Sequence, residues 1–548
     1  MRITAKIMQN NSLSNINVNK TLQDKLNTQM ATEKKINRPS DDPVVAIRAL
    51  RLRTNVSQVS QYYEKNAPDA ESWLKVTEDA LSTVSAVITD MIKQCTKGSN
   101  ENLTSADRNT ILDALKGLRD EVYATGNADY AGRSVFTGYR TESTLKFIAD
   151  TQKTYSITEH ITAADIDSVT HITVGELNSI NEANYSNTEY NGIVEQDMKE
   201  MSVYRIRLSY SDVDALSQYK AVDTDGDGVA EQTAPTLMNF DAATGEYKPL
   251  QVDTDGDGVL DTDMSAITTA SIMDKPSPYE SVPDNGAVLI KETGELLLGK
   301  NVYNSLMSKK DNINTVFDES SILVSYQKTS WEKDDLKPEH YFTCTDMTSD
   351  NQAEHVTYNS AYIVPGEEVE KQIIEYDIGM NQTIRVNTTA DEVFRHAIGR
   401  DVDDLVTALQ DVVDMESTVA RLEAMVKDPK YNDDQRAVIQ KQLDAANKAF
   451  IQLSEKAQKM FESGITKMQN HLDTANLAVT NCGTRSKTLE LISTRLMSQK
   501  TNFETLESEN ENVDITEVAI QLSSAELTYE AALMATGKIM KTSLMDYI

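Results

Sequence analysis

Several residue types are scarce in this chain of 548 residues, and each scarcity excludes a class of protein. The three cysteines, Cys95, Cys344 and Cys482, lack the density of a disulfide framework and the spacing of a metal site. Eleven prolines and 21 glycines are few for this length, as expected where much of the chain is long helix. No apolar run is long enough to span a bilayer, so the sequence predicts no membrane-spanning helix.

Basic residues are also few relative to acidic ones. The chain has 53 Lys and Arg against 86 Asp and Glu, which gives a formal net charge of −33. This charge argues against nucleic acids and anionic membranes as partners, because both are negatively charged. Self-assembly must therefore depend on apolar seams. The first stretch, MRITAKIMQNNSLSNINVN, lacks the apolar region and cleavage site of a secretory signal, so none is expected.

Catalytic motifs are missing as well. The sequence contains no HExxH, no GxSxG and no glycine loop that would hold a phosphate. The histidines are scattered and are expected to be structural or surface residues: His160, His171, His340, His355, His396 and His471. The sequence therefore predicts that the protein is not an enzyme.

Helical periodicity is strong at both ends of the chain. Mostly apolar residues recur at alternating steps of three and four, which indicates a heptad seam. The N-terminal line is Val56, Val59, Tyr63, Asn66, Ala70, Trp73, Thr77, Ala80, Val84, Val87 and Met91, and the C-terminal line is Ile515, Val518, Leu522, Ala525, Tyr529, Ala532, Thr536 and Ile539. The simplest arrangement pairs the two ends, and the alternative is an ordinary helical bundle at each end.

The stretch KKINRPSDDP, residues 34–43, interrupts the N-terminal helical pattern. Pro39 and Pro43 lack a backbone donor and push the preceding residues out of the helical region. A first helix should therefore stop near Asn37. Ser40, Asp41 or Asp42 should cap a second helix that has Pro43 at its first position. We predict a shaped break that sets one helix at an angle to the next, with a plain surface loop as the alternative.

The middle of the chain, residues 146–389, changes to a period of two. Tyr204, Ile206, Leu208 and Tyr210 alternate with polar residues, and residues 287–299 and 373–386 are each typical of strand–turn–strand. We therefore expect a β-rich region inserted between the helical ends.

The motif VDTDGDGV occurs twice in this middle region, at 222–229 and 252–259. It places carboxylates at positions 1, 3 and 5 and glycine at position 6, as a Ca²⁺ loop requires. The candidate ligands are Asp223, Asp225, Asp227, Asp253, Asp255, Asp257 and, at position 9 of the second copy, Asp261. Neither copy has the closing acid of an EF-hand at position 12. Calcium is the one cofactor that the sequence suggests, and a pair of metal-free Asp-Gly turns is the alternative.

These features occur together in one family. The chain resembles the hook-associated protein 3 family of the bacterial flagellum, whose members are relatives of flagellin and form the hook–filament junction. The motifs that carry the resemblance are MRIT, KKINRPSDDPVVAIRALRLRTNVSQVSQYYEKN, WLKVTEDALSTV, DRNTILDALKGLRDEV, YAGRSVFTGYRT and AELTYEAALMATGKIMKTSLMDYI. The middle region resembles the family only near residues 373–402.

The resemblance implies a flagellin-like architecture, mainly α at both ends with paired termini and an inserted β-rich domain. The implied segments are an N-terminal inner helix (1–38), two halves of a helical stem (39–145 and 390–509), the insert with its Asp-rich loops (146–389) and a C-terminal inner helix (510–548). The implied assembly interface consists of Leu22, Leu26, Val518, Leu522, Ala525, Tyr529, Ala532 and Ile539.

The resemblance also implies a function without catalysis. A member of this family is exported by the flagellar type III apparatus and joins the hook to the filament outside the cell. The implied partners are further copies of the chain in a ring, hook-associated protein 1, flagellin and an export chaperone. Two alternatives are a flagellin-like filament subunit and a calcium-binding surface adhesin that acts through the insert.

Overall fold

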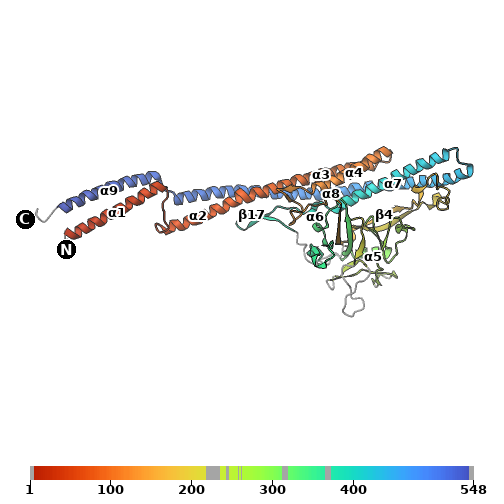
Figure 1. Cartoon of the computed structure of the whole chain (residues 1–548), viewed down its shortest axis with the longest axis horizontal. Coiled ribbons are helices and arrows are strands. Elements are labelled where there is room, and N and C mark those ends of the chain that lie inside the picture. The colour runs from red at the N-terminus through yellow and green to blue at the C-terminus, as the bar shows by residue number, and fades with distance from the viewer. Residues whose placement is uncertain are drawn as a thin grey trace, which may run out of the picture. The chain divides into compact units, whose positions relative to one another are not determined.

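The structure, a computed structural model, describes residues 5–217, 235–241, 246–256, 258–260, 262–310, 319–363 and 372–541. Helices form both ends of the chain and strands form its middle, so the predicted fold class is confirmed (Figure 1). The chain divides into two units. The first comprises Met1–Glu71, Glu375–Ile384 and Ser486–Ile548, and the second comprises Ser72–Ile374 and Arg385–Arg485. The boundaries of the five predicted segments stay predictions.

The described α-helices account for the two ends of the chain and two short segments of its middle. They are α1 (Ala5–Thr32), α2 (Pro43–Gln61), α3 (Ala67–Gly98), α4 (Ser105–Thr125), α5 (Lys300–Ser308), α6 (Ala390–Val393), α7 (His396–Lys427), α8 (Asp433–Glu511) and α9 (Ile515–Lys541). None of them, over the residues described, is both long and apolar enough to cross a membrane.

The predicted break between the first two helices is present in the first unit, but α1 ends earlier than the predicted Asn37. α1 ends at Thr32, and α2 begins at Pro43 with Asp42 as its N-cap. The Asp42 carboxylate accepts hydrogen bonds from the backbone N–H groups of Val44 and Val45, at 2.9 and 3.2 Å. This satisfies two of the donors that a helix start leaves free. The cap is thus the last of the three predicted candidates, and it fixes where α2 begins.

The first unit also contains a feature that the sequence did not reveal. A π-helical turn, Tyr62–Asn66, joins α2 to α3 where one uninterrupted helix was expected. The hairpin of β17 (Glu375–Gly379) and β18 (Gln382–Arg385) contacts this turn, because the Asn66 side-chain amide donates to the Asp377 carbonyl at 2.7 Å. The Tyr376 hydroxyl also donates to the Asp69 carboxylate. The predicted strand–turn–strand at 373–386 is therefore confirmed, and it contacts the helix at its irregular turn.

In the second unit, α3 packs antiparallel to α8. The Cys482 thiol donates to the Leu74 carbonyl at 3.4 Å, and the Ser85 hydroxyl donates to the Asn476 side chain at 2.7 Å. Leu74 and Cys482 are fully buried. The predicted seam residues Ala70, Trp73, Thr77, Ala80, Val84, Val87 and Met91 are buried as well. The three-and-four spacing therefore identified the packed face of α3 correctly.

The α7–α8 hairpin carries an unexpected attachment from the middle of the chain. The described residues between 177 and 198 pack their apolar side chains onto the two helices. Leu177 and Ile180 are fully buried there, in a cluster with Met415 and Leu422 of α7 and Ile439 of α8. The second unit is thus held together by contacts between the insert and the helices.

The strands of the second unit form two main sheets, antiparallel except where β11 pairs with β12. One has the order β11 (Thr268–Ala270), β12 (Ala287–Ile290), β13 (Glu295–Leu298), β5 (Glu200–Arg207) and β4 (Ile166–Ile172). The other has the order β16 (Val356–Tyr358), β15 (Thr343–Asp346), β3 (Thr151–Ile161), β14 (Ile322–Trp331), β7 (Met238–Asp241) and β8 (Glu246–Pro249), with β6 (Ala215–Ser217) also paired to β14. Two small pairs complete the set: β1 (Asp129–Tyr130) with β2 (Arg133–Ser134), and β9 (Gln251–Val252) with β10 (Thr262–Asp263).

Side chains from both main sheets meet in one apolar core. Tyr155, Tyr326 and Trp331 of one sheet pack with Ile206 and Leu289 of the other. The hairpin predicted at 287–299 appears as β12 and β13, with all eight strand residues buried. A sheet that is buried on both faces shows continuous apolar runs instead of alternation, which explains the pattern of this hairpin.

Candidate functional site

The two terminal helices pair with each other in the first unit (Figure 1). Leu26 of α1 and Val518 and Ala525 of α9 are buried in the contact, and Leu522 packs against them. Tyr529 and Ala532 are half-buried on the same face of α9. The side chain of Ile539 lies outside the described residues. The three-and-four line of α9 therefore faces α1.

Leu22 lies one helical turn before the buried Leu26 and is 46% exposed in the single chain, so its place in the predicted assembly interface stays a prediction. It belongs to a set of large apolar side chains on α1 and α9 that point to solvent. The set consists of Ile7, Met8, Leu13, Val18, Leu22 and Met30 on α1, and Ile515, Ile520, Leu527, Leu533 and Met534 on α9. We call these eleven residues the outer apolar surface. Exposed apolar side chains in this number on one helix pair are suited to contact with other proteins.

A double break in the chain lies at the base of this pair. The segment after α1 and the segment between α8 and α9 run side by side, with an antiparallel bridge between Lys34 and Asn512. The Lys35 N–H donates to the Glu511 carbonyl at 2.7 Å, and the Val513 N–H donates to the Glu33 carbonyl at 3.1 Å. Backbone groups freed by the two helix ends thus satisfy each other.

The Glu511 carboxylate is the charged centre of this double break. Its side chain is only 5% exposed, and it accepts two hydrogen bonds of 2.5 Å from the Arg53 guanidinium. Lys34 adds an ion pair at 3.4 Å. The Arg53 hydrogen bonds lower the pKa of Glu511 below its ordinary value, so the carboxylate is charged at neutral pH. A buried carboxylate with two cations from two other segments fixes the geometry of the break.

The predicted calcium ligands lie mostly outside the described residues, which include only Asp253 and Asp255 of the seven. The Asp253 carboxylate accepts hydrogen bonds from the Gly256 and Gly258 N–H groups, at 2.6 and 2.9 Å. Both glycines have positive φ, of 80° and 86°, so the second loop turns sharply around the Asp253 side chain. Within the described part of the chain, no group of three or more His, Cys, Asp or Glu side chains could hold a metal ion. Calcium binding stays a prediction.

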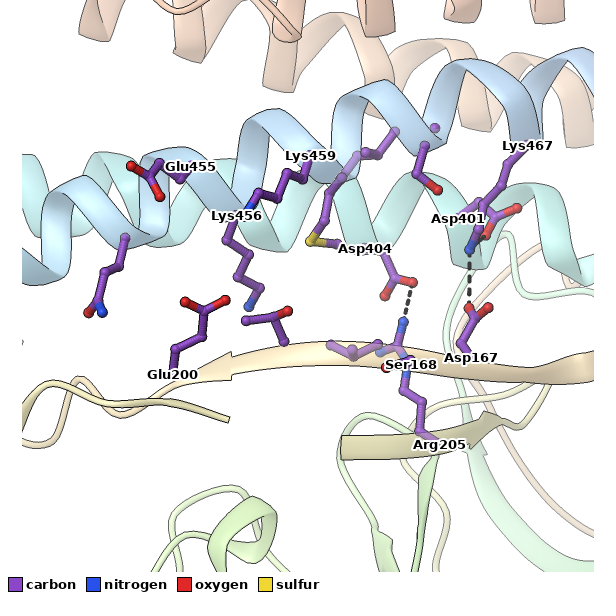
Figure 2. A pocket seen from close by; sticks show the side chains of 17 residues that line it. Asp167, Ser168, Glu200, Arg205, Asp401, Asp404, Glu455, Lys456, Lys459 and Lys467 are labelled. Carbon is purple, nitrogen blue, oxygen red and sulfur yellow. Dashed lines mark hydrogen bonds and ion pairs between the residues drawn. The ribbon is translucent and has the colours of Figure 1, made fainter. Parts of the chain in front are cut away.

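A cavity of about 220 Å³ lies between strands β4 and β5 and helices α7 and α8 (Figure 2). Ion pairs cross it: Arg205 contacts Asp404 at 2.5 Å, and Lys467 contacts Asp401 and Asp167 at 2.9 and 3.1 Å. In Figure 2, Lys456 points from α8 toward the strand that carries Glu200. Burial lowers the pKa of Lys456. The cavity contains acids and bases in similar number, so its groups pair across it and connect the strands to the helices.

Next to this cavity, Arg205 also pairs with the buried Glu295 of β13, and Arg207 pairs with Asp404. Burial alone would raise the pKa of Glu295, but the charges of Arg205 and Arg207 outweigh it and hold that pKa below its ordinary value. We call these four residues the Arg–carboxylate cluster. Its members on the strands and on the helix are distant in sequence, so the spacing of residues along the chain could not predict the cluster.

The buried histidines are suited to structural roles. Burial lowers the pKa of His171 and His340 to about 4 and that of His396 to about 3, so all three are neutral at pH 7. His396 lies among the rings of Tyr210, Tyr341 and Phe342. A general base for neutral pH needs a pKa near 7, and these three histidines fall well below it.

Comparison with known proteins shows which proteins this chain is similar to. Residues 3–141 match the family described as the bacterial flagellin N-terminal helical region. The chain is 33% identical over 144 residues to flagellar hook-associated protein 3 of Salmonella typhimurium, a match that covers 26% of this chain and 45% of that protein. It is 29% identical over 127 residues to a flagellin of Clostridium tyrobutyricum, covering 23% of this chain and 33% of that protein. The chain thus spans less than half the length of these relatives.

Among solved structures, hook-associated protein 3 of Legionella pneumophila aligns over 82% of this chain and 98% of its own, with 10% identity and a TM-score of 0.20. That structural similarity is low, and the sequence matches carry the relationship. The region that matches the flagellin N-terminal family contains α1, the capped break after it and the helices α2 to α4. Among flagellin-like proteins, the chain is similar to flagellar hook-associated protein 3.

Proposed function

We propose that the chain is a structural subunit of the bacterial flagellum and acts as the adaptor between hook and filament. The observation that carries this proposal is the outer apolar surface. It consists of eleven large apolar side chains, from 42% to 69% exposed, on helices that are already paired with each other. The sequence similarity to a hook-associated protein supports the assignment of this surface to flagellar assembly.

The expected partners follow from the chemistry of the surface. With a net charge of −33, copies of the chain repel one another except where apolar side chains meet. We therefore expect the outer apolar surface to contact further copies in a ring, hook-associated protein 1 on one side and flagellin on the other. Before assembly these apolar side chains would be exposed to water, and we expect an export chaperone to bind and shield them.

Export and location follow from the same proposal. We expect the chain to pass unfolded through the flagellar export apparatus and to fold outside the cell. The three cysteines are free and buried, so folding does not depend on disulfide formation. The mechanism is mechanical, and no bond is made or broken in the adaptor role.

The direct test is electron microscopy of flagella from a strain that lacks this protein. We expect complete hooks without filaments, and restoration of the filaments when the gene is returned. Normal filaments in the deletion strain would contradict the adaptor role.

The match to a flagellin favours one second candidate, a filament subunit. The two functions differ in self-assembly. A filament subunit forms long filaments when the purified protein is incubated alone, whereas an adaptor does not. Long filaments of this chain alone, seen by negative-stain microscopy, would replace the adaptor proposal with the filament one.

A further inference from the structure

A lysine and an asparagine of the β-rich middle are in contact in a geometry that suits bond formation between them. Asn239 lies on β7 and is 6% exposed, and Lys309 follows directly after α5 and is partly buried. The Lys309 ammonium donates to Asn239 Oδ1 at 2.6 Å. The lysine nitrogen is therefore next to the carboxamide carbon of Asn239.

The orientation of the Asn239 amide is set by two further hydrogen bonds. Its Nδ2 group donates to the backbone carbonyls of Glu319 and Ser321, at 2.8 and 2.9 Å. Both partners can only accept, so the nitrogen of the amide must face them and the oxygen must face Lys309. A fixed carbonyl beside a fixed amine is the arrangement in which proximity gives the largest gain in rate.

The surroundings also favour the neutral amine, which is the reactive form of lysine. Burial lowers the pKa of Lys309, and the charges of Glu319 and Asp241 act in the opposite direction. Desolvation of a lysine is a usual way in which proteins activate an amine nucleophile. Asp241 already pairs with Lys248 at 2.5 Å. Of the two carboxylates, Glu319 acts more strongly on the Lys309 amine, so we take it as the candidate for proton transfer.

We propose that Lys309 and Asn239 form an intramolecular isopeptide bond after the chain has folded. The Lys309 ammonium gives a proton to the Glu319 carboxylate, and the neutral Nζ attacks Cγ of Asn239. The Nζ–Cγ bond forms and the Cγ–Nδ2 bond breaks, and Nδ2 takes one proton from Nζ and the proton held by Glu319. An ammonium ion is released for each bond formed, and neither an oxidant nor an added cofactor is needed.

A second pair in the chain has similar contacts and provides an internal comparison. The Lys34 ammonium donates to Asn512 Oδ1 at 2.7 Å, with Glu511 at 3.4 Å. The Lys34 side chain, however, is 43% exposed, so water solvates its ammonium and competes for its hydrogen bonds. We expect the bond at Lys309–Asn239 and not at Lys34–Asn512.

The test is mass spectrometry of the purified full-length protein. We expect the intact mass to be lower than the sequence mass by one ammonia, and a protease digest to contain a branched peptide that joins Lys309 to Asn239. Fragmentation is essential, because succinimide formation at Asn191-Gly192 or Asn285-Gly286 also loses ammonia. Linear peptides that carry unmodified Lys309 and Asn239, or an ammonia loss located at either Asn-Gly step, would overturn the proposal.

Variants distinguish the proposed isopeptide bond from a simple hydrogen bond between Lys309 and Asn239. Lys309→Arg keeps a cation at the position but is expected to abolish the branched peptide, whereas Lys310→Arg is expected to leave it unchanged. Glu319→Gln is expected to slow its appearance after refolding, because the proton acceptor is lost. A branched peptide that forms at the same rate in Glu319→Gln would remove Glu319 from the step, and its persistence in Lys309→Arg would contradict the assignment of Lys309.

Discussion

At the scale of single residues, Glu511 makes several interactions that no sequence pattern around it predicts. Its carboxylate contacts Arg53 of α2 and Lys34 of the break, and its carbonyl accepts from Lys35. A buried acid with two cationic partners is strongly destabilising when it loses them, and the partners lose little because both remain in water. Substitution of Glu511 is therefore the sharper test of these interactions.

We expect Glu511→Gln to loosen the double break. Arg53 and Lys34 are both more than a third exposed, so the loss should be modest, about 1 kcal/mol of local opening free energy. Hydrogen exchange at the Lys35 and Val513 amides measures it directly, because both donate across the break. The exposed Glu509→Gln is the matched control and should leave these rates unchanged. Equal rates in all three proteins would contradict the role given to Glu511.

The same residue predicts a dependence on pH. The pKa of Glu511 is lowered in the folded state, so its contribution to stability is present above its ordinary pKa of 4.5 and is lost as the pH falls through the lower folded value. We expect exchange at Lys35 and Val513 to show this acid-linked opening below about pH 4.5 in the native chain and much less of it in Glu511→Gln.

Calcium binding is the other prediction at this scale. Three carboxylates within five residues repel one another, and a divalent cation removes that repulsion. Titration calorimetry of the full chain should show Ca²⁺ binding at up to millimolar concentration, weakened by Asp255→Asn and by Asp225→Asn. Saturation at 100 times Kd would add about 2.7 kcal/mol to the stability of the folded state. Absence of heat and an unchanged melting temperature would reduce both motifs to Asp-Gly turns.

At the scale of elements, α9 has two faces with different tasks. Ala525 lies in the contact with α1, whereas Leu527, two residues later, is 69% exposed. Two residues on a helix are about 200° apart, so the two positions point in nearly opposite directions. The inner face holds the pair together, and the outer face is available to a partner.

Matched substitutions on these faces should separate pairing from assembly. Ala525→Asp buries an unpaired charge between the helices, at a cost of about 2–4 kcal/mol, and should release α1 and α9 to rapid proteolysis. Leu527→Asp should leave proteolysis unchanged but prevent incorporation into flagella, measured by motility and by microscopy. Normal flagella with Leu527→Asp would show that this part of the outer apolar surface is not an interface.

The sequence predicted elements well where one periodic signal dominated. The stripe from Ala70 to Met91 is buried as expected, and the hairpins at 287–299 and 373–386 are present. The π-helical turn at Tyr62–Asn66 was missed, because one extra residue in a turn leaves the neighbouring spacing nearly unchanged. Leu22 is exposed in the single chain whereas Leu26 is buried, and the role of Leu22 in assembly stays a prediction.

At the scale of the whole molecule, most of the insert is part of the second unit, and only Glu375–Ile384 belongs to the first. Strands β4 and β5 connect to α7 and α8 through the cavity of Figure 2 and through the Arg–carboxylate cluster. Arg205 and Asp404 are 199 residues apart in sequence, so no local pattern could have revealed their contact. We therefore expect insert and helical hairpin to unfold together.

Asp404→Asn tests that expectation. It removes the carboxylate charge opposite Arg205 and Arg207, whose side chains are 5% and 16% exposed, and should cost about 3 kcal/mol. Calorimetry should show the main unfolding transition shifted to lower temperature as a single peak. Asp473→Asn, an exposed change on α8, should not shift it. A peak that splits in two for Asp404→Asn would show that insert and helices unfold separately.

The double break has a mechanical consequence. Two backbone segments pass the same point of the chain, one after α1 and one before α9, and hydrogen bonds tie them to each other. A pull on the terminal pair is therefore shared between two covalent backbone segments. Rotation of the pair about its long axis would have to shear the bridge at Lys34 and Asn512, whereas bending across it would not. We therefore expect the break to bend more readily than it twists, a property that suits the proposed adaptor role.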